Sequence, residues 1–126
     1  MLEEDIVKQQ LYVCRDSGEM VSVFVLNRET DKEYASGAWA YPNASYAVVH
    51  RLCVNVDMQR RGVGLGTMKL IEGMVKEQGT ACIRLDPFSQ NPLAVNLYTK
   101  LGFKIVGAIQ LRKGQFYLFE KRLIEE

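Results

Sequence analysis

An apolar segment that leads through glycines straight into a helical pattern constrains the fold of this chain most. Residues 46–56, YAVVHRLCVNV, are rich in β-branched residues and predict a strand. The glycine-containing sequence QRRGVGLG follows at 59–66. Apolar residues then recur at helical spacing: Leu65, Met68, Ile71 and Val75. This helix is expected to stop at Gly79, and the unit predicts a right-handed parallel strand–helix–strand crossover.

Further strands and one more helix are expected on both sides of this unit. The strands are expected at 11–16, 20–27, 46–56, 81–88, 103–111 and 115–123. Asn91, a favoured N-cap residue followed by Pro92, predicts the start of a second helix. Residues 2–9 carry two apolar side chains four positions apart among acidic residues and indicate the end of an amphipathic helix. The expected fold is α/β (α+β): a mixed, mostly antiparallel sheet with a central parallel crossover and helices packed on its faces.

The composition is that of one ordinary globular domain. The chain has 126 residues, with 16 Lys plus Arg against 15 Asp plus Glu. A net charge of +1 lacks the basic excess of a dedicated nucleic-acid binder. The longest run without charge, residues 34–49, is too short and too polar to span a bilayer, so no membrane association is expected. The acidic start, MLEEDIVKQQ, does not resemble a signal peptide, and the cytoplasm is the expected compartment.

The cysteines show no pattern of a metal site. Cys14, Cys53 and Cys82 are an odd set without metal-ligand spacing, each within an apolar stretch. We expect them to be reduced, buried strand residues, and we expect no metal.

The glycine-containing junction is suited to an anion. Glycines let the backbone approach a ligand closely, and the N–H groups and dipole at a helix start favour a phosphate. Arg60 and Arg61 add positive charge. The pattern is not a Walker A loop, and Thr67 stands where GxGxxG needs its third glycine. A phosphate cradle and a close-packed strand-to-helix turn therefore both stay open.

A second motif lies about 30 residues further on, in NPLAVNLYTKLGF at 91–103. Taken alone it is a capped helix in which Tyr98 follows the buried Leu97, and Tyr98 would be a packing residue with a hydrated hydroxyl. Together the two segments resemble the GNAT superfamily of acyl-CoA-dependent N-acetyltransferases, which carry Q/RxxGxG/A and later NxxAxxLYxxxGF. The matching residues are Gln59, Gly62 and Gly64 in the first pattern and Asn91, Ala94, Leu97, Tyr98, Gly102 and Phe103 in the second. A register with Arg61, Gly64 and Gly66 also fits the first pattern.

The resemblance implies acetyl-CoA as cosubstrate and transfer of its acetyl group directly to a primary amine of a small molecule, a protein or a peptide. The CoA-binding positions implied at the junction are Gln59, Arg60, Arg61, Gly62, Val63 and Gly64. The backbone of Leu52 and Val54 is implied to pair with the pantetheine amides, which requires this strand to part from the next. Asn91 is implied to contact CoA, and Tyr98 to protonate the departing thiolate.

The residue that takes the amine proton stays open. Val48 stands where histone-type members of the family carry a glutamate. His50, expected on the same face as Val48 and Leu52, has a suitable pKa for a base but also fits a hydrogen-bonded core residue. Asp86 and Ser89 follow the next strand, near the expected acceptor position, and Asp86 equally fits a turn or capping residue.

The segment before Leu11 departs from the family. Members usually carry a strand and two helices there, whereas this chain offers about ten residues, so it resembles a short form or a piece of a longer parent. A sheet without its first strand has an exposed edge, which predicts a homodimer or strand exchange. The missing pieces normally line the acceptor site, so a non-catalytic CoA-binding or interaction module is the alternative to the enzyme. A domain that binds another nucleotide is a more distant third.

Overall fold

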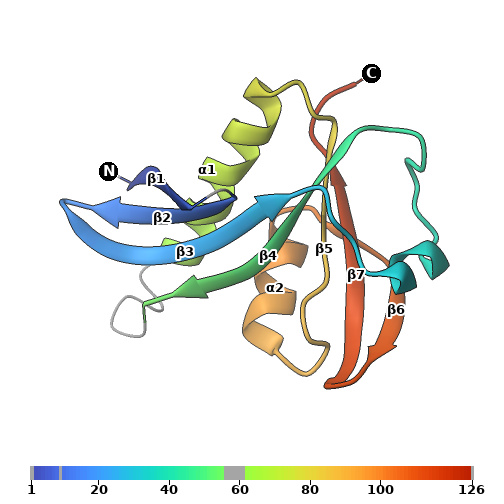
Figure 1. Cartoon of the computed structure of the whole chain (residues 1–126). Helices are drawn as coiled ribbons and strands as arrows, with labels where there is room; N and C mark the ends of the chain where they lie inside the picture. Colours follow the sequence, from blue (N-terminus) through green and yellow to red (C-terminus); the bar gives the residue numbers. More distant parts are fainter. Residues whose placement is uncertain (1, 9, 56–61, 126) are drawn as a thin grey trace.

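The apolar run after residue 45 forms the central strand of a seven-stranded sheet, in a computed structural model that describes residues 2–8, 10–55 and 62–125. The strand order is β1-β2-β3-β4-β5-β7-β6, and only β4 and β5 pair in parallel (Figure 1). The strands are β1 (Leu2–Lys8), β2 (Leu11–Asp16), β3 (Glu19–Asn27), β4 (Tyr46–Val54), β5 (Cys82–Leu85), β6 (Lys104–Leu111) and β7 (Gly114–Arg122). The helices are α1 (Val63–Glu77), α2 (Pro92–Lys100) and the short 3₁₀ helix η1 (Lys32–Ser36). The predicted mixed sheet with a parallel crossover is confirmed.

The helix ends follow the local signals in the sequence. Gly62 precedes α1 with φ +75°, a left-handed conformation that glycine adopts without strain. Gly79, with φ +76°, lies just beyond the other end. The Asn91 side chain accepts a hydrogen bond from the backbone N–H of Ala94 at 3.2 Å, and Pro92 occupies the first turn of α2.

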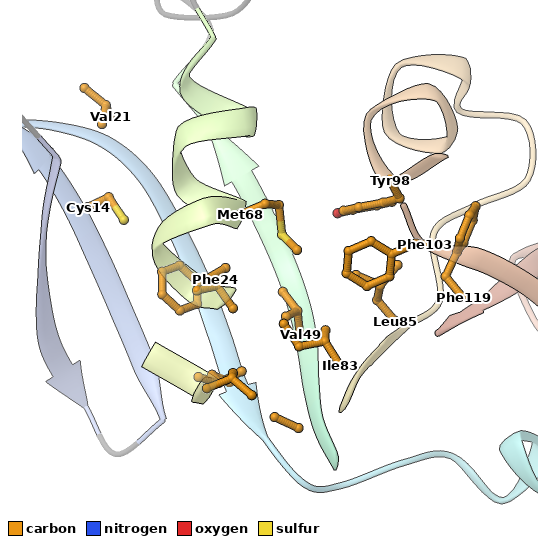
Figure 2. Packing of buried hydrophobic residues seen from close by; sticks show 14 residues of the cluster. Cys14, Val21, Phe24, Val49, Met68, Ile83, Leu85, Tyr98, Phe103 and Phe119 are labelled. Atoms are coloured by element: carbon orange, nitrogen blue, oxygen red, sulfur yellow. The ribbon is translucent and has the colours of Figure 1, made fainter. Parts of the chain in front are cut away.

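The two faces of the sheet have different covers. Val49 packs with Met68 of α1 and Tyr98 of α2, so both helices lie on one face, here called the helix face (Figure 2). Val48 packs against Tyr34 of η1 on the opposite face, here called the loop face, beneath the connecting segment 28–45. Successive residues of β4 thus serve two separate cores, as the alternation of a strand requires.

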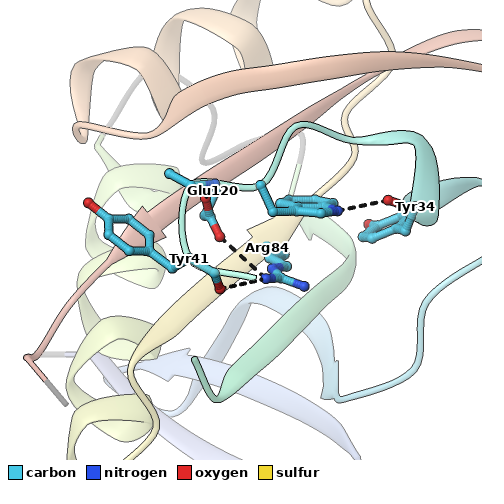
Figure 3. Close-up of polar contacts among 6 residues, drawn as sticks. Tyr34, Tyr41, Arg84 and Glu120 are labelled. Atoms are coloured by element: carbon cyan, nitrogen blue, oxygen red, sulfur yellow. Dashed lines mark hydrogen bonds and ion pairs between the residues drawn. The ribbon is translucent and has the colours of Figure 1, made fainter. Parts of the chain in front are cut away.

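A buried arginine anchors segment 28–45 to the loop face (Figure 3). The Arg84 guanidinium lies 4.2 Å from the ring centroids of both Trp39 and Tyr46. It donates a hydrogen bond to the Tyr41 carbonyl at 3.1 Å and forms an ion pair with Glu120 at 3.4 Å. The Arg84 side chain is only 7% exposed. A charge buried to this extent needs a counterion, which Glu120 supplies.

The segment that precedes β2 differs from the prediction. Residues 2–8 form the edge strand β1, antiparallel to β2, so the predicted helix end is wrong and a strand does stand before the hairpin. Two apolar residues four positions apart lie on the same side of a helix. Because four is an even number, they also lie on the same face of a strand. Pairing with β2 gives the backbone N–H and C=O groups of residues 2–8 hydrogen-bond partners, and this favours the strand over the helix.

The cysteines also depart in part from expectation. Cys14 and Cys82 are buried as predicted, whereas Cys53, near the end of β4, is exposed. Within the described residues, no helix has the length and apolar character needed to cross a bilayer.

We expect Glu120→Gln to destabilise the protein by about 3 kcal/mol, because it leaves the buried Arg84 charge without its counterion. Urea unfolding of the two proteins measures this loss. The control is Glu125→Gln, which breaks the exposed Arg122–Glu125 pair and should cost less than about 1 kcal/mol. Equal losses in the two variants would show that Arg84 does not depend on Glu120.

Candidate active site

Strands β4 and β5 part beyond their third residue pair. Their parallel register runs from Tyr46–Cys82 to Val48–Arg84, after which β4 continues to Val54 while β5 ends at Leu85. In the described residues, the β5-facing backbone of β4 therefore has no strand partner from residue 49 onward. An extended ligand could pair with those exposed N–H and C=O groups as a strand would.

A β-bulge in β4 sits where the strands part. Arg51 and Leu52 together oppose Phe24 of β3, and Arg51 has a left-handed φ of +53°. The extra residue reverses the alternation, so Leu52 packs with the core of the helix face. His50, before the bulge, stays on the loop face with Val48. The prediction that Leu52 shares this face is therefore wrong.

A cavity of about 190 Å³ opens between the parted strands and α2. It is lined in part by Leu52, Leu85, Asp86, Asn91 and Tyr98. Three of the residues singled out from segments far apart in sequence, Leu52, Asn91 and Tyr98, thus meet at one cavity, and Asp86 joins them from the end of β5.

Tyr98 brings a protonated hydroxyl to this cavity. Its side chain is 7% exposed and packs against the rings of Phe103 and Phe119, at centroid distances of 5.7 and 5.9 Å. Figure 2 shows its hydroxyl pointing from α2 toward β4. Burial, together with the charge of Asp86, raises the pKa of Tyr98 to about 12. The phenol therefore keeps its proton at neutral pH, as a proton donor must.

His50 lies on the loop face beside the end of β3. Its Nε2 is 2.9 Å from Asn27 Oδ1 and 3.1 Å from the Glu29 carbonyl oxygen. Asn27 was not identified from the sequence, because its contact with His50 depends on the register of β3 against β4 rather than on local spacing. Its position at a predicted strand end was the only available signal.

Asp86 carries a partly buried carboxyl group directly after β5. Burial raises its pKa above the ordinary value, while the nearby charge of His50 and a contact with Tyr34 act in the opposite direction. Ser89, also expected near the acceptor, has a buried hydroxyl without a hydrogen-bond partner in the described part of the chain. It is not among the residues that line the cavity.

The junction before α1 is described only in part. Gln59, Arg60 and Arg61 lie outside the described residues, whereas Gly62, Val63 and Gly64 form the start of α1. A Cβ placed on Gly64 would lie 3.4 Å from Leu97 and 3.9 Å from Val54. The turn is therefore closely packed against β4 and α2, and its backbone lies next to the end of the parted strand.

No group of three or more His, Cys, Asp or Glu residues in the described ranges could hold a metal ion.

Comparison with known proteins identifies the family. Residues 3–103 match the model of the Acetyltransferase (GNAT) family. The chain belongs to this family. It is therefore an acetyltransferase of the GNAT type, and the family uses acetyl-CoA. No curated protein matches the chain in sequence.

Solved structures share the GNAT fold at low sequence identity. A GNAT acetyltransferase of Streptococcus agalactiae 2603 has a TM-score of 0.77 and 18% identity over 92% of this chain and 66% of its own. Ard1 of Thermoplasma volcanium has a TM-score of 0.74 and 20% identity, over 92% and 72%. YncA of Salmonella typhimurium, solved with its cofactor acetyl-CoA, has a TM-score of 0.71 and 15% identity, over 92% and 65%.

We expect Asp86→Asn to raise the melting temperature at pH 7 by a few degrees. The pKa of Asp86 is raised in the folded state, so its contribution to stability is full below its ordinary pKa of 3.8 and is lost as the pH rises through the folded-state pKa. The gain in the variant should therefore shrink on acidification toward pH 4. Thermal unfolding across this range, with Glu19→Gln as an exposed control, measures it; a gain that does not depend on pH would contradict this account.

Proposed function

We propose that this GNAT protein transfers the acetyl group of acetyl-CoA directly to a primary amine, carried by a small molecule, a protein or a peptide. The observation that carries the proposal is the protonated Tyr98 hydroxyl at a cavity between the parted strands β4 and β5. The cavity has an open strand edge on one side and a proton donor on the other. The edge would hold the extended acyl donor, and the donor would protonate the thiolate that leaves when an amine attacks the thioester.

The proposed cofactor site runs from the start of α1 to this cavity. The pyrophosphate of CoA would bind the backbone N–H groups at the start of α1, with Arg60 and Arg61 neutralising its charge and Gln59 beside them. The residues proposed for this part of the cofactor site are Gln59, Arg60, Arg61, Gly62, Val63 and Gly64. Leu52 and Val54 would pair through their backbone with the pantetheine amides, since β5 does not occupy that edge. Asn91, which lines the cavity, would contact CoA there.

In the proposed mechanism two side chains move protons, and the enzyme forms no covalent intermediate. Bound acetyl-CoA supplies an acyl group activated as a thioester. The parted strands hold this group beside the acceptor amine, so that the C–N bond forms as the C–S bond breaks. His50 takes a proton from the amine, and Tyr98 donates one to the departing sulfur.

We further propose that residues 1–126 act as a single GNAT domain in the cytoplasm. The edge strand β1 is a surface through which a homodimer would form, because its outer N–H and C=O groups have no partner strand in the described part of the chain. A non-catalytic CoA-binding or interaction module is the second candidate. It is supported by residues 2–8, which form the strand β1 without the two helices that family members usually carry before the β2–β3 hairpin.

Calorimetric titration with acetyl-CoA should show micromolar binding, about −8 kcal/mol. Arg60→Ala/Arg61→Ala should abolish this binding, because it removes both guanidinium groups from the proposed pyrophosphate site. The matched control is Arg112→Ala/Lys113→Ala, which removes two charges from the β6–β7 turn and should bind like the parent. Equal binding by all three proteins would contradict the arginine contribution, and absence of binding in the parent would contradict the cofactor site.

Tyr98→Phe should slow acetyl transfer on the order of 10²-fold while acetyl-CoA affinity stays nearly unchanged. The change removes only the hydroxyl and keeps the ring packing against Phe103 and Phe119. Release of CoA with a panel of amines, measured for both proteins, tests this. Equal rates would remove Tyr98 from the mechanism. Binding of acetyl-CoA without any transfer by the parent would favour the non-catalytic module.

A further inference from the structure

Arg51 has a backbone conformation that arginine rarely adopts. Three non-glycine residues in the described part of the chain have a left-handed φ: Gln10, Ser17 and Arg51. Gln10 and Ser17 lie in the tight turns that join β1 to β2 and β2 to β3, where hairpins use this conformation. Arg51 is the one of the three that lies within a strand, at the bulge of β4. Its φ of +53° is therefore a property of the bulge.

The bulge itself does not call for an arginine. Glycine adopts a left-handed φ without strain, because it has no Cβ to crowd the neighbouring carbonyl oxygen. Any other residue at this φ destabilises the fold relative to glycine. Strain of this kind persists where the residue has a function that compensates for it. The reason for an arginine at position 51 is therefore to be found in its side chain.

The Arg51 side chain lines the cavity between the parted strands and is exposed there to solvent. Its guanidinium makes no hydrogen bond or ion pair with the residues that the structure describes. Arg84 of β5, by contrast, is buried and paired with Glu120. The cavity wall thus carries a permanent positive charge that the described residues leave without a counterion.

Asp86 is the other charged residue of the cavity wall, and it forms no ion pair with Arg51 in the described structure. Its carboxyl lies near the His50 charge and the Tyr34 hydroxyl, both on the loop face. The apolar part of the cavity wall consists of Val49, Leu52, Leu85, Pro87, Phe88 and Ala94. A guanidinium in such a setting binds an anion more strongly than at an open surface, because less water competes with the anion.

The anion that fits this position is a carboxylate of the acceptor. The phosphates of CoA are proposed to lie at the start of α1, which packs against Val54. Arg51 precedes Val54 by three residues, about 10 Å along an extended strand. The pantetheine and acetyl parts of the donor, which are proposed to lie at the cavity, carry no charge. A negative charge at Arg51 would therefore come from the acceptor, and the planar guanidinium fork matches a carboxylate.

We propose that Arg51 binds a carboxylate of the acceptor, and that the acceptor is a small amine that also carries a carboxylate, as free amino acids do. The proposal rests on the proposed acetyl transfer and restricts its acceptor class. Arg51 and Tyr98 line one cavity of about 190 Å³, so the carboxylate and the reacting amine belong to one small molecule. A polyamine, which has no carboxylate, would leave the Arg51 charge unpaired.

The strain at Arg51 is tested by comparing Arg51→Gly with Arg51→Ala. Both changes remove the guanidinium, but only glycine adopts the left-handed φ without strain. Arg51→Gly should therefore melt a few degrees above Arg51→Ala. Thermal unfolding of the two variants measures this difference. Equal melting temperatures would overturn the inference that position 51 holds an arginine at a cost in stability.

The carboxylate site is tested with L-phenylalanine and with L-phenylalaninamide, which keeps the amine and the ring but has no carboxylate. The ring suits the apolar wall that includes Phe88, which is 39% exposed. In ¹⁵N-labelled protein the amino acid should shift the Nε–H signal of Arg51, and the amide should not. Arg51→Gly should weaken binding of the amino acid at least about tenfold.

The matched control is Arg112→Ala, which removes an exposed arginine of the β6–β7 turn and should bind both probes like the parent. Equal binding of the two probes by the parent, no binding of the amino acid, or unchanged affinity in Arg51→Gly would overturn the carboxylate site.

These binding measurements need no acetyl transfer. Release of CoA from acetyl-CoA, measured with the same two acceptors, should show a preference for phenylalanine of at least about tenfold in kcat/KM, and Arg51→Gly should lose it. Release of CoA with amines but without this preference would contradict this inference alone. Binding of the carboxylate at Arg51 without release of CoA would contradict the proposed function alone.

Discussion

The stacking of Arg84 between Trp39 and Tyr46 is the interaction on which the rest of the structure depends. Arg84 belongs to the last parallel pair of β4 and β5, so its position coincides with the point where the two strands part. Its ion pair with Glu120 ties β5 to β7, and its hydrogen bond to Tyr41 ties both to segment 28–45. One buried cation thereby holds together the sheet below the opening and the segment that covers it.

The opening separates the candidate catalytic residues between the two faces of one sheet. Tyr98 approaches it from the helix face, where burial keeps the phenol protonated. His50 and Asp86 approach it from the loop face, where the bulge at Arg51 ends the regular alternation of β4. The strand edge between them is the part that the helices and segment 28–45 leave unpaired. Leu52 of β4, Asp86 after β5 and Tyr98 of α2 line one cavity, so a short chain brings residues from three parts of the fold together there.

Local signals in the sequence predicted most of the elements but little of the chemistry on the loop face. The cap at Asn91 and the glycine before α1 act within one turn of chain, so their effects are readable from spacing. Strand β1 was missed because an even spacing suits a helix and a strand alike. The bulge was missed because a left-handed Arg51, unlike a glycine, has no signature in sequence. The contact of Asn27 with His50 depends on long-range register, which no local pattern encodes.

The two-sided arrangement has a consequence for the divergence of this domain. Segment 28–45 packs on the loop face, whereas α1 and α2 pack on the helix face. Under the proposed function, substitutions in the covering segment would therefore change the side of the opening proposed for the acceptor, while the packing of the side proposed for acetyl-CoA would be kept. The two faces have separate cores, so under the proposed function each could be redesigned without rebuilding the packing of the other.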